Sequence, residues 1–291
     1  MRLGTPTSSS QSPRAESREV SELRRLRTEQ PALASAIDLH IELMEMERRV
    51  RARVPLPRNY RQVASLTERL AAGQPLLQFD EIPLDWSDFR RLFRETADTL
   101  RRHGMMEESE CQRVHALTRD GDALPPLARW WYNIAAEPEK AGEAPIEQAE
   151  LLHHALLHAL RPFLMRSAEA ILPSVDLTSW QRGSCPLCGG DPDFALWNAT
   201  ASGDRQLLCG RCAGQWSYPD PQCAFCGIAE AAQLRTFAGS PRIYRVEACD
   251  ACHRYLKGFD GRVAGRPLML TFDAVATLPL DAAVIQRGYI G

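Results

Sequence analysis

The chain has 291 residues, more than one domain usually contains, so we expect two or three structural units. Hydrophobic residues make up 44% and charged residues 25%, and the formal net charge of -2 gives no support for a nucleic-acid partner or an acidic membrane surface. No apolar run approaches the roughly 20 residues that span a bilayer, so membrane insertion is not expected.

The N-terminal segment is rich in Ser, Thr, Pro and Arg and has few large apolar side chains. We predict that residues 1–19 are disordered, because they cannot bury enough surface to offset the entropy of ordering. The segment has no apolar core of a secretory signal, so the expected location is the cytoplasm. In that reducing compartment, closely spaced cysteine pairs more often bind metal or do redox work than form disulfides.

Residues 20–172 are predicted to form a helical domain. Apolar residues recur at helical spacing over residues 21–54. A further helix is expected after Asp85, which suits the N-cap position, and it should end at Gly104. The clearest helical pattern covers residues 146–172. No alternation typical of strands competes with these patterns.

Cysteine pairs dominate the C-terminal third. Four C-x2-C pairs are separated by 20, 10 and 22 residues, which indicates an internal repeat of two modules. The first pair of each module is followed by a glycine, Gly189 or Gly227, that can take the backbone conformation needed to close the turn. Paired C-x2-C turns bring four sulfurs to one ion, as in zinc ribbons and rubredoxin-like modules. The eight predicted metal ligands are Cys185, Cys188, Cys209, Cys212, Cys223, Cys226, Cys249 and Cys252.

Short hairpins are predicted between the paired cysteines. Residues 194–199 can pair with residues 205–208 around Gly203-Asp204, and residues 233–238 can pair with residues 243–246. Short loop closure favours metal sites within each module, although the residues do not exclude crossed pairing. Tetrahedral sulfur sites suit zinc and iron alike, and the residues by themselves slightly favour zinc. The pattern of a thioredoxin-type dithiol or a four-iron cluster is not seen.

The predicted fold class is therefore α+β: an N-terminal helical domain followed by two small rubredoxin-like or zinc-ribbon-like metal modules. The modules are expected at residues 180–220 and 221–266, and a C-terminal tail at residues 267–291.

The motifs of this region resemble the FdhE family, the formate dehydrogenase accessory (formation) proteins. The resemblance covers about residues 180–289, and the helical half fits the family's layout only loosely. It is carried by Trp180-x-x-Gly183-x-Cys185-Pro186-x-Cys188-Gly189, Leu208-Cys209-x-x-Cys212 with Trp216 four residues on, Cys223-x-x-Cys226-Gly227, Glu247-Ala248-Cys249-Asp250-x-Cys252, Tyr255-Leu256-Lys257 and Asp273-x-x-x-x-Leu278-x-Leu280-Asp281. One departure lies between Trp216 and Cys223, where the family has an arginine and this chain has Ser217-Tyr218-Pro219-Asp220-Pro221-Gln222.

The resemblance implies a cytoplasmic factor that binds the catalytic subunit of formate dehydrogenase and is needed for assembly or activation of that enzyme. It also implies two iron ions, each in a rubredoxin-like site made by four of the eight cysteines, with zinc as the alternative. The residues leave open whether such a factor would act as a folding chaperone, by proofreading or by redox activation of the client. They also leave the oligomeric state open.

Several other residues were considered as functional. Buried aromatic side chains tend to anchor interfaces, so Trp216, Tyr244 and Tyr255 are candidate partner-binding residues, or else they shield the metal sulfurs from water. Asp273 and Asp281 are candidates to cap helices or to anchor the tail against the metal modules. The remaining candidates are weaker: His153, His154 and His158 for a metal, His253 as a replacement ligand or neighbour of the metal, and Cys111 as a small buried side chain.

No nucleophilic triad pattern or glycine-rich phosphate loop is present, so the chain is not expected to be an enzyme. Two other functions remain as alternatives. One is a rubredoxin-like electron carrier, although such carriers are usually small. The other is a zinc-ribbon protein that binds nucleic acid. Residues 182–266 contain ten Arg or Lys and eight Asp or Glu, and two divalent ions with four thiolates each would add about -2 per site, which is a poor match to phosphate.

Overall fold

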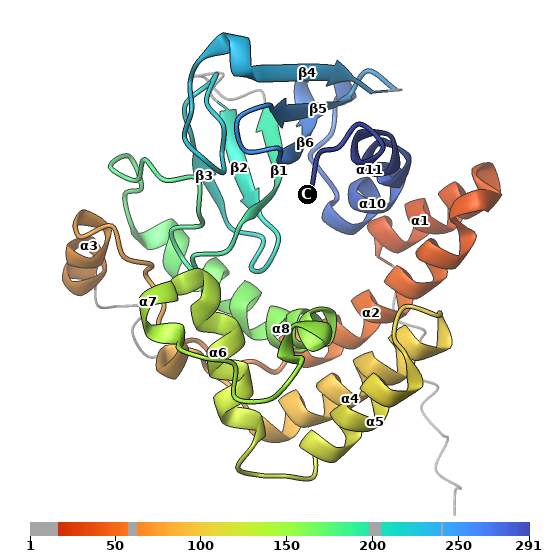
Figure 1. Ribbon diagram of the computed structural model, residues 1–291, viewed down its shortest axis with the longest axis vertical. Coiled ribbons are helices and arrows are strands. Elements are labelled where there is room, and N and C mark those ends of the chain that lie inside the picture. The colour runs from red at the N-terminus through yellow and green to blue at the C-terminus, as the bar shows by residue number, and fades with distance from the viewer. Residues whose placement is uncertain (1–16, 58–62, 198–204, 240) are drawn as a thin grey trace, which may run out of the picture.

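Helices build the N-terminal half and a mixed sheet builds the C-terminal half (Figure 1). The computed structural model describes residues 17–57, 63–197, 205–239 and 241–291. Most of the segment predicted to be disordered lies outside these residues, but α1 already begins at Arg18. The helices of the first half are α1 (Arg18–Glu29), α2 (Ala34–Arg51), α3 (Val63–Ala71), α4 (Trp86–Arg102), α5 (Glu108–Leu117), α6 (Leu124–Ala136), α7 (Pro138–Ala141) and α8 (His153–Ile171).

The predicted helices are present, with two differences at their ends. Asp85 caps α4, since its side chain accepts a hydrogen bond from the Asp88 backbone N–H. The helical stretch expected over residues 21–54 is two helices, α1 and α2, because Pro31 interrupts the backbone pattern and starts a short 3-10 turn. The last long helix begins with a 3-10 turn at Ala149–Leu152 and becomes α-helical at His153. Among the described helices, none combines the length and apolar character needed to cross a bilayer.

The strands of both predicted modules belong to one six-stranded sheet in the order β3-β2-β1-β6-β5-β4. Antiparallel pairing joins the strands inside each half of the sheet, and β1 pairs with β6 in parallel at the centre. The predicted hairpins are confirmed as β1–β2 and β4–β5, although the turn at Gly203-Asp204 lies outside the described residues. The strands are β1 (Pro192–Trp197), β2 (Arg205–Cys209), β3 (Gln215–Ser217), β4 (Leu234–Ala238), β5 (Tyr244–Cys249) and β6 (Tyr255–Asp260).

Both faces of the sheet are covered at its centre, at β1 and β6, whereas the edge strand β4 is largely exposed. Successive side chains of a strand point to opposite faces, so Phe194 and Leu196 of β1 pack toward the C-terminal segment, while Ala195 and Trp197 join the core of the helical half. That helical core also contains the four cysteines of the first module. The helical half and the first module therefore share one hydrophobic core, and the α+β fold with two small cysteine-rich units is confirmed.

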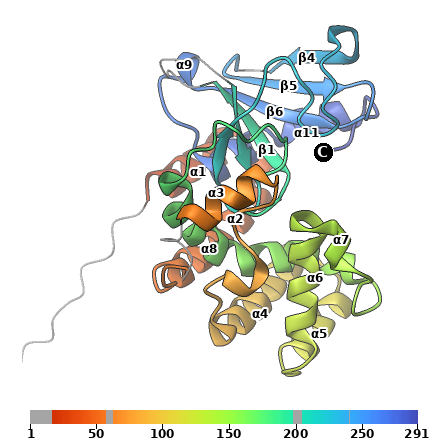
Figure 2. The ribbon, with the colours of Figure 1, turned by 90° about the vertical axis from the view of Figure 1, so that its left-hand side faces the viewer.

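The C-terminal segment is more ordered than a simple tail. It forms α10 (Leu270–Ala276) and α11 (Leu278–Ile285), after the short α9 (Gly261–Ala264). Figures 1 and 2 show α11 beside the sheet, and Figure 1 shows α10 next to it. Helix α10 packs against α1. The two ends of the described chain thus meet on one side of the molecule.

Candidate metal centres

The eight paired cysteines gather into two clusters of four, one in each half of the sheet. In each cluster all four sulfur atoms lie within 4.8 Å of one another. The shortest Sγ–Sγ distances are 3.5 Å in the first cluster and 3.7 Å in the second. A disulfide would require about 2.05 Å. Four sulfurs at metal-bond lengths of about 2.3 Å around a tetrahedral ion would be about 3.8 Å apart, which is close to the distances seen here. The donor set and its spacing therefore fit one ion per cluster.

Each cluster is assembled within its own module rather than by crossed pairing. The first contains Cys185, Cys188, Cys209 and Cys212, and the second contains Cys223, Cys226, Cys249 and Cys252.

The four C-x2-C turns share one backbone design. The residue four positions after the first cysteine has a positive φ in every turn: 68° at Gly189, 58° at Ala213, 76° at Gly227 and 57° at His253. Its N–H donates to the carbonyl of the first cysteine over 2.8–3.1 Å. This left-handed residue closes the turn and leaves both sulfurs on the same side. His253 is thus a turn residue with an exposed side chain, and it is not part of the cluster.

Backbone N–H groups also point at sulfurs in the second turn of the first cluster. Arg211 N–H lies 3.3 Å from Cys209 Sγ, and Gly214 N–H lies 3.4 Å from Cys212 Sγ. Such contacts stabilise the negative charge of a metal-bound thiolate.

The first cluster is closed by the helical half. Its sulfur-bearing residues are at most 1% exposed. The backbone N–H groups of Leu76 and Leu77 donate to the carbonyls of Pro186 and Leu187, at 2.8 and 3.0 Å. A Cβ on Gly189 would lie 2.5 Å from Ala136 Cα, so helix α6 presses directly on the turn. Contacts from two separate parts of the helical half therefore hold the Cys185–Cys188 turn in place.

Arg211 joins this cover from the sheet side. It is 7% exposed and donates to the carbonyls of Trp131 and Tyr132, at 2.6 and 3.1 Å. Its guanidinium carbon also lies 3.8 Å from the centroid of the Trp131 ring. The buried cation ties the sheet to two carbonyls of α6 and places a positive charge beside the cysteine cluster.

The second cluster is open. Cys223 and Cys249 are 6% and 2% exposed, but Cys252 is half-buried and Cys226 is exposed. A cavity of about 70 Å³ lies between Cys223, Cys249 and Arg205 on the inner side of the cluster. Arg205 is 3% exposed and links the two halves of the sheet through a 2.5 Å hydrogen bond to Glu247, while its Nε has no partner.

The thiols respond differently to their surroundings. Burial raises the pKa of the Cys185 thiol well above its ordinary value, and it raises the pKa of Cys223 to about 12. The pKa of Cys226 is lowered, because the Ile228 backbone N–H and the neighbouring thiols outweigh the effect of burial. Thiols that resist ionisation become thiolates when a cation binds, so metal binding competes with protons and weakens as the pH falls.

The three aromatic residues considered as partner anchors are buried inside the chain. Trp216 is 2% exposed and donates from Nε1 to the Arg182 carbonyl at 3.0 Å. Tyr244 and Tyr255 are 4% and 8% exposed and donate their hydroxyls to Asp273 and Asp281. All three side chains are used in internal contacts, and their role in partner binding stays a prediction.

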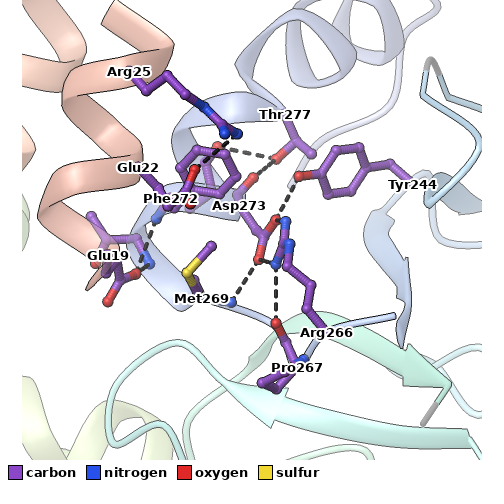
Figure 3. A network of polar contacts seen from close by, with 12 residues as sticks. Glu19, Glu22, Arg25, Tyr244, Arg266, Pro267, Met269, Phe272, Asp273 and Thr277 are labelled. Atoms are coloured by element: carbon purple, nitrogen blue, oxygen red, sulfur yellow. Dashed lines mark hydrogen bonds and ion pairs between the residues drawn. The ribbon is translucent and has the colours of Figure 1, made fainter. Parts of the chain in front are cut away.

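Asp273 and Asp281 anchor the C-terminal segment to the second half of the sheet, as one of the two expectations proposed. Asp273 is fully buried and accepts hydrogen bonds from Tyr244 at 2.5 Å and from Arg266 at 2.6 and 2.9 Å (Figure 3). Asp281 binds Tyr255 at 2.7 Å and Lys257 at 3.1 Å. On the other side of α10, Glu19 of α1 accepts from the Thr271 N–H at 2.6 Å.

His153 and His158 of α8 have separate structural partners, while the ring of His154 lies against that of His153. His153 Nδ1 accepts a hydrogen bond from Trp131 Nε1 at 3.1 Å, and burial lowers its pKa to about 4, so the ring is neutral. His158 Nδ1 lies 2.6 Å from Glu47 Oε1. Cys111, which the sequence left outside the repeat, is buried beside Asp98 and His115, and the distance from His115 Nε2 to Asp98 Oδ1 is 2.8 Å.

Sequence reasoning missed the residues that cover the first cluster. Leu76, Leu77 and Arg211 carry no motif, and their role depends on contacts between segments more than 50 positions apart in the chain. For Arg211, the sequence offered one signal of a role at the cluster: a basic residue between Cys209 and Cys212.

Comparisons with known proteins show clear similarities. No family model matches the chain. A protein named "Protein FdhE homolog" from Shewanella oneidensis is 33% identical over 111 residues, which is 38% of this chain and 36% of that protein. A protein of the same name from Stutzerimonas stutzeri is 28% identical over 199 residues, which is 60% of this chain and 65% of that protein. The matches thus span between about one third and two thirds of the length of these relatives.

The fold comparison extends over nearly the whole chain. The crystal structure of the FdhE protein from Pseudomonas aeruginosa superposes with a TM-score of 0.64 and 20% sequence identity, and it covers 94% of this chain and 91% of that one. At this identity the match describes the fold. Together with the sequence relatives, it confirms the resemblance that the cysteine motifs indicated.

Proposed function

Because the chain resembles the FdhE family in sequence and in fold, we propose that it is an accessory factor for formate dehydrogenase. In this proposal it binds the catalytic subunit in the cytoplasm and is needed for assembly or activation of the enzyme. It acts as a binding protein and not as a catalyst. The observation that carries the proposal is the sequence similarity to proteins named FdhE homolog, in a chain that gathers its eight paired cysteines into two clusters.

The proposal includes two metal ions per chain, each held by the four cysteines of one cluster. We propose iron, with zinc as the alternative, since tetrahedral thiolate sites accept both. The ion would stabilise the turns of each module, because metal-ligand bonds supply folding free energy that small modules lack. Elemental analysis of protein purified without oxygen tests this part: two ions per chain are expected, and a red colour in the oxidised protein identifies iron.

A genetic and a biochemical experiment test the client. Deleting the gene should abolish formate-dependent respiration without lowering transcription of the dehydrogenase. A tagged copy should restore respiration and recover the catalytic subunit, and the untagged protein serves as the control for retention on the resin. If formate oxidation is unchanged in the deletion strain and no dehydrogenase subunit co-purifies, the proposal is wrong.

One observation favours a second candidate, a rubredoxin-like electron carrier. Electron exchange with a partner requires a metal site near the surface, and Cys226 of the second cluster is exposed. An iron-loaded protein that passes electrons to a soluble acceptor, in cells whose formate respiration does not depend on it, would place this candidate first.

A further inference from the structure

The two clusters have the same ligands but opposite surroundings. All four cysteines of the first cluster are at most 1% exposed, whereas Cys226 of the second is exposed and Cys252 is half-buried. Both exposed ligands occupy the second position of their C-x2-C turns, and the corresponding residues of the first cluster, Cys188 and Cys212, are covered. The difference therefore comes from what packs on the turns and not from the turns themselves.

The cover of the first cluster comes from distant segments. Leu76 and Leu77 bond to the carbonyls inside the Cys185–Cys188 turn, and α6 packs on Gly189. At the other turn, a hollow of about 340 Å³ lies beside Cys212, but Cys212 itself is 1% exposed. Leu172 lines this hollow, and its Cδ1 would lie 2.6 Å from a Cβ on Gly214. A ligand from solution cannot reach these sulfurs without displacing part of the helical half.

The second cluster lacks such a cover on its outer side. A Cβ on Gly227, which corresponds to Gly189, would meet only the end of the Gln222 side chain, at 3.7 Å. On the inner side a cavity of about 70 Å³ lies beside Cys223 and Cys249. The two arginines that flank the cluster are each paired with a carboxylate: Arg235 lies 2.8 Å from Asp250 and Arg254 lies 2.9 Å from Asp191.

We propose that the second cluster is an exchange site, where a metal ion can be reached by an external soft anionic ligand such as a small thiolate, while the first cluster is a closed structural site. This inference rests on the metal-binding part of the proposed function and does not depend on the identity of the client. The two modules of the repeat would then have separate tasks: one holds the fold together, and the other presents a metal to the outside.

The exchange is a substitution at the ion. With an ion held there, an incoming thiolate would take the place of Cys226 Sγ on the open side, and the displaced Cys226 thiolate would take a proton from the buffer. The metal keeps its oxidation state, and no electrons are transferred. The exposed position of Cys226 makes it the first ligand to leave, followed by Cys252.

Metal release from the full-length protein tests the inference. The chain is loaded with two zinc ions without oxygen and mixed with an excess of the chromogenic chelator 4-(2-pyridylazo)resorcinol. We expect two phases of one ion each, with the second about 10-fold to 100-fold slower, in the range by which residues around a metal site alter its binding. Alkylation with iodoacetamide after the fast phase, followed by mass spectrometry, should modify Cys226 and Cys252 and spare Cys188 and Cys212.

Variants test whether packing of the helical half on the first cluster causes its slower metal release. Cys226→Ser should abolish the fast phase and leave the slow phase unchanged. Leu172→Ala opens the hollow beside Cys212 and should accelerate the slow phase, whereas Leu151→Ala, the same change at a leucine that is 45% exposed, should not. Three results would overturn the inference: a chain that binds no metal, a single release rate for both ions, or loss of the slow phase in Cys226→Ser. None of them would contradict the proposal that the protein binds formate dehydrogenase.

Discussion

Gly189→Ala and Gly227→Ala make the same change at equivalent positions of the two modules, and they should have different effects. Both glycines close a C-x2-C turn in the left-handed conformation, with φ of 68° and 76°. A Cβ on Gly189 would lie 2.5 Å from Ala136 Cα and 2.6 Å from the Ala135 carbonyl oxygen. The nearest atom to a Cβ on Gly227 is the end of the Gln222 side chain, at 3.7 Å.

The magnitudes follow from these two surroundings. Placing an alanine in the left-handed region costs about 1–2 kcal/mol, and this term is common to both variants. Ala213 already occupies the same position of another turn, so the conformation itself is tolerated. At Gly189 the new methyl group also meets backbone atoms of α6 that cannot rotate away, and overpacking of this kind costs about 1–3 kcal/mol more. We therefore expect about 1–2 kcal/mol for Gly227→Ala and about 2–5 kcal/mol for Gly189→Ala.

Equilibrium unfolding in urea at fixed free zinc measures the difference, with the helical signal followed by circular dichroism. Gly189→Ala should shift the transition to lower urea and reduce retention of one zinc ion, because α6 and the first cluster must move apart. Gly227→Ala should shift the transition by the smaller amount expected from its left-handed backbone alone. If the two variants lose equal free energy of unfolding, or if Gly227→Ala loses more, the conclusion that helix α6 packs directly on the Cys185–Cys188 turn is refuted.

Three further predictions follow from the buried polar groups and the shared core. Asp273→Asn removes the carboxylate that pairs with Arg266 and accepts from the Tyr244 hydroxyl, so it should lower the free energy of unfolding by about 3–5 kcal/mol in urea titrations. The control Asp38→Asn changes an exposed ion pair and should lower it by less than about 1 kcal/mol. Cys185→Ser should lower the melting temperature of the helical signal and Cys223→Ser should not, because only the first cluster lies in the core of the helical half; equal melting shifts would contradict this. Burial lowers the pKa of His40 from 6.5 to about 4, so the neutral ring contributes stability above pH 6.5 that is lost as the pH falls toward 4, by up to about 1.4 kcal/mol per pH unit. His40→Gln should flatten the pH dependence of unfolding in that window, and an unchanged slope would count against the prediction.

Local features of the chain were predictable from the sequence because their causes are local. The cap at Asp85 and the hairpins between cysteine pairs depend on residues within a few positions of one another. The interruption at Pro31 is also a local feature, but the prediction of one helical stretch over residues 21–54 missed it. The eight cysteines could be grouped for the same reason, since each cluster closes over a short loop. Each motif that carries the family resemblance is likewise a short segment of the chain.

The sequence by itself therefore determined the cysteine clusters, the strands of the hairpins and the family resemblance. Only the tertiary structure decided how the two modules differ. The parallel pairing of β1 with β6 merges them into one sheet, although these strands lie more than 50 residues apart. The cover over the first cluster, the burial of Tyr244 and Tyr255, and the packing of α10 on α1 likewise depend on distant segments. The two modules have similar sequence patterns, so the patterns do not indicate which module the helical half will bury. Burial depends on how the whole chain packs.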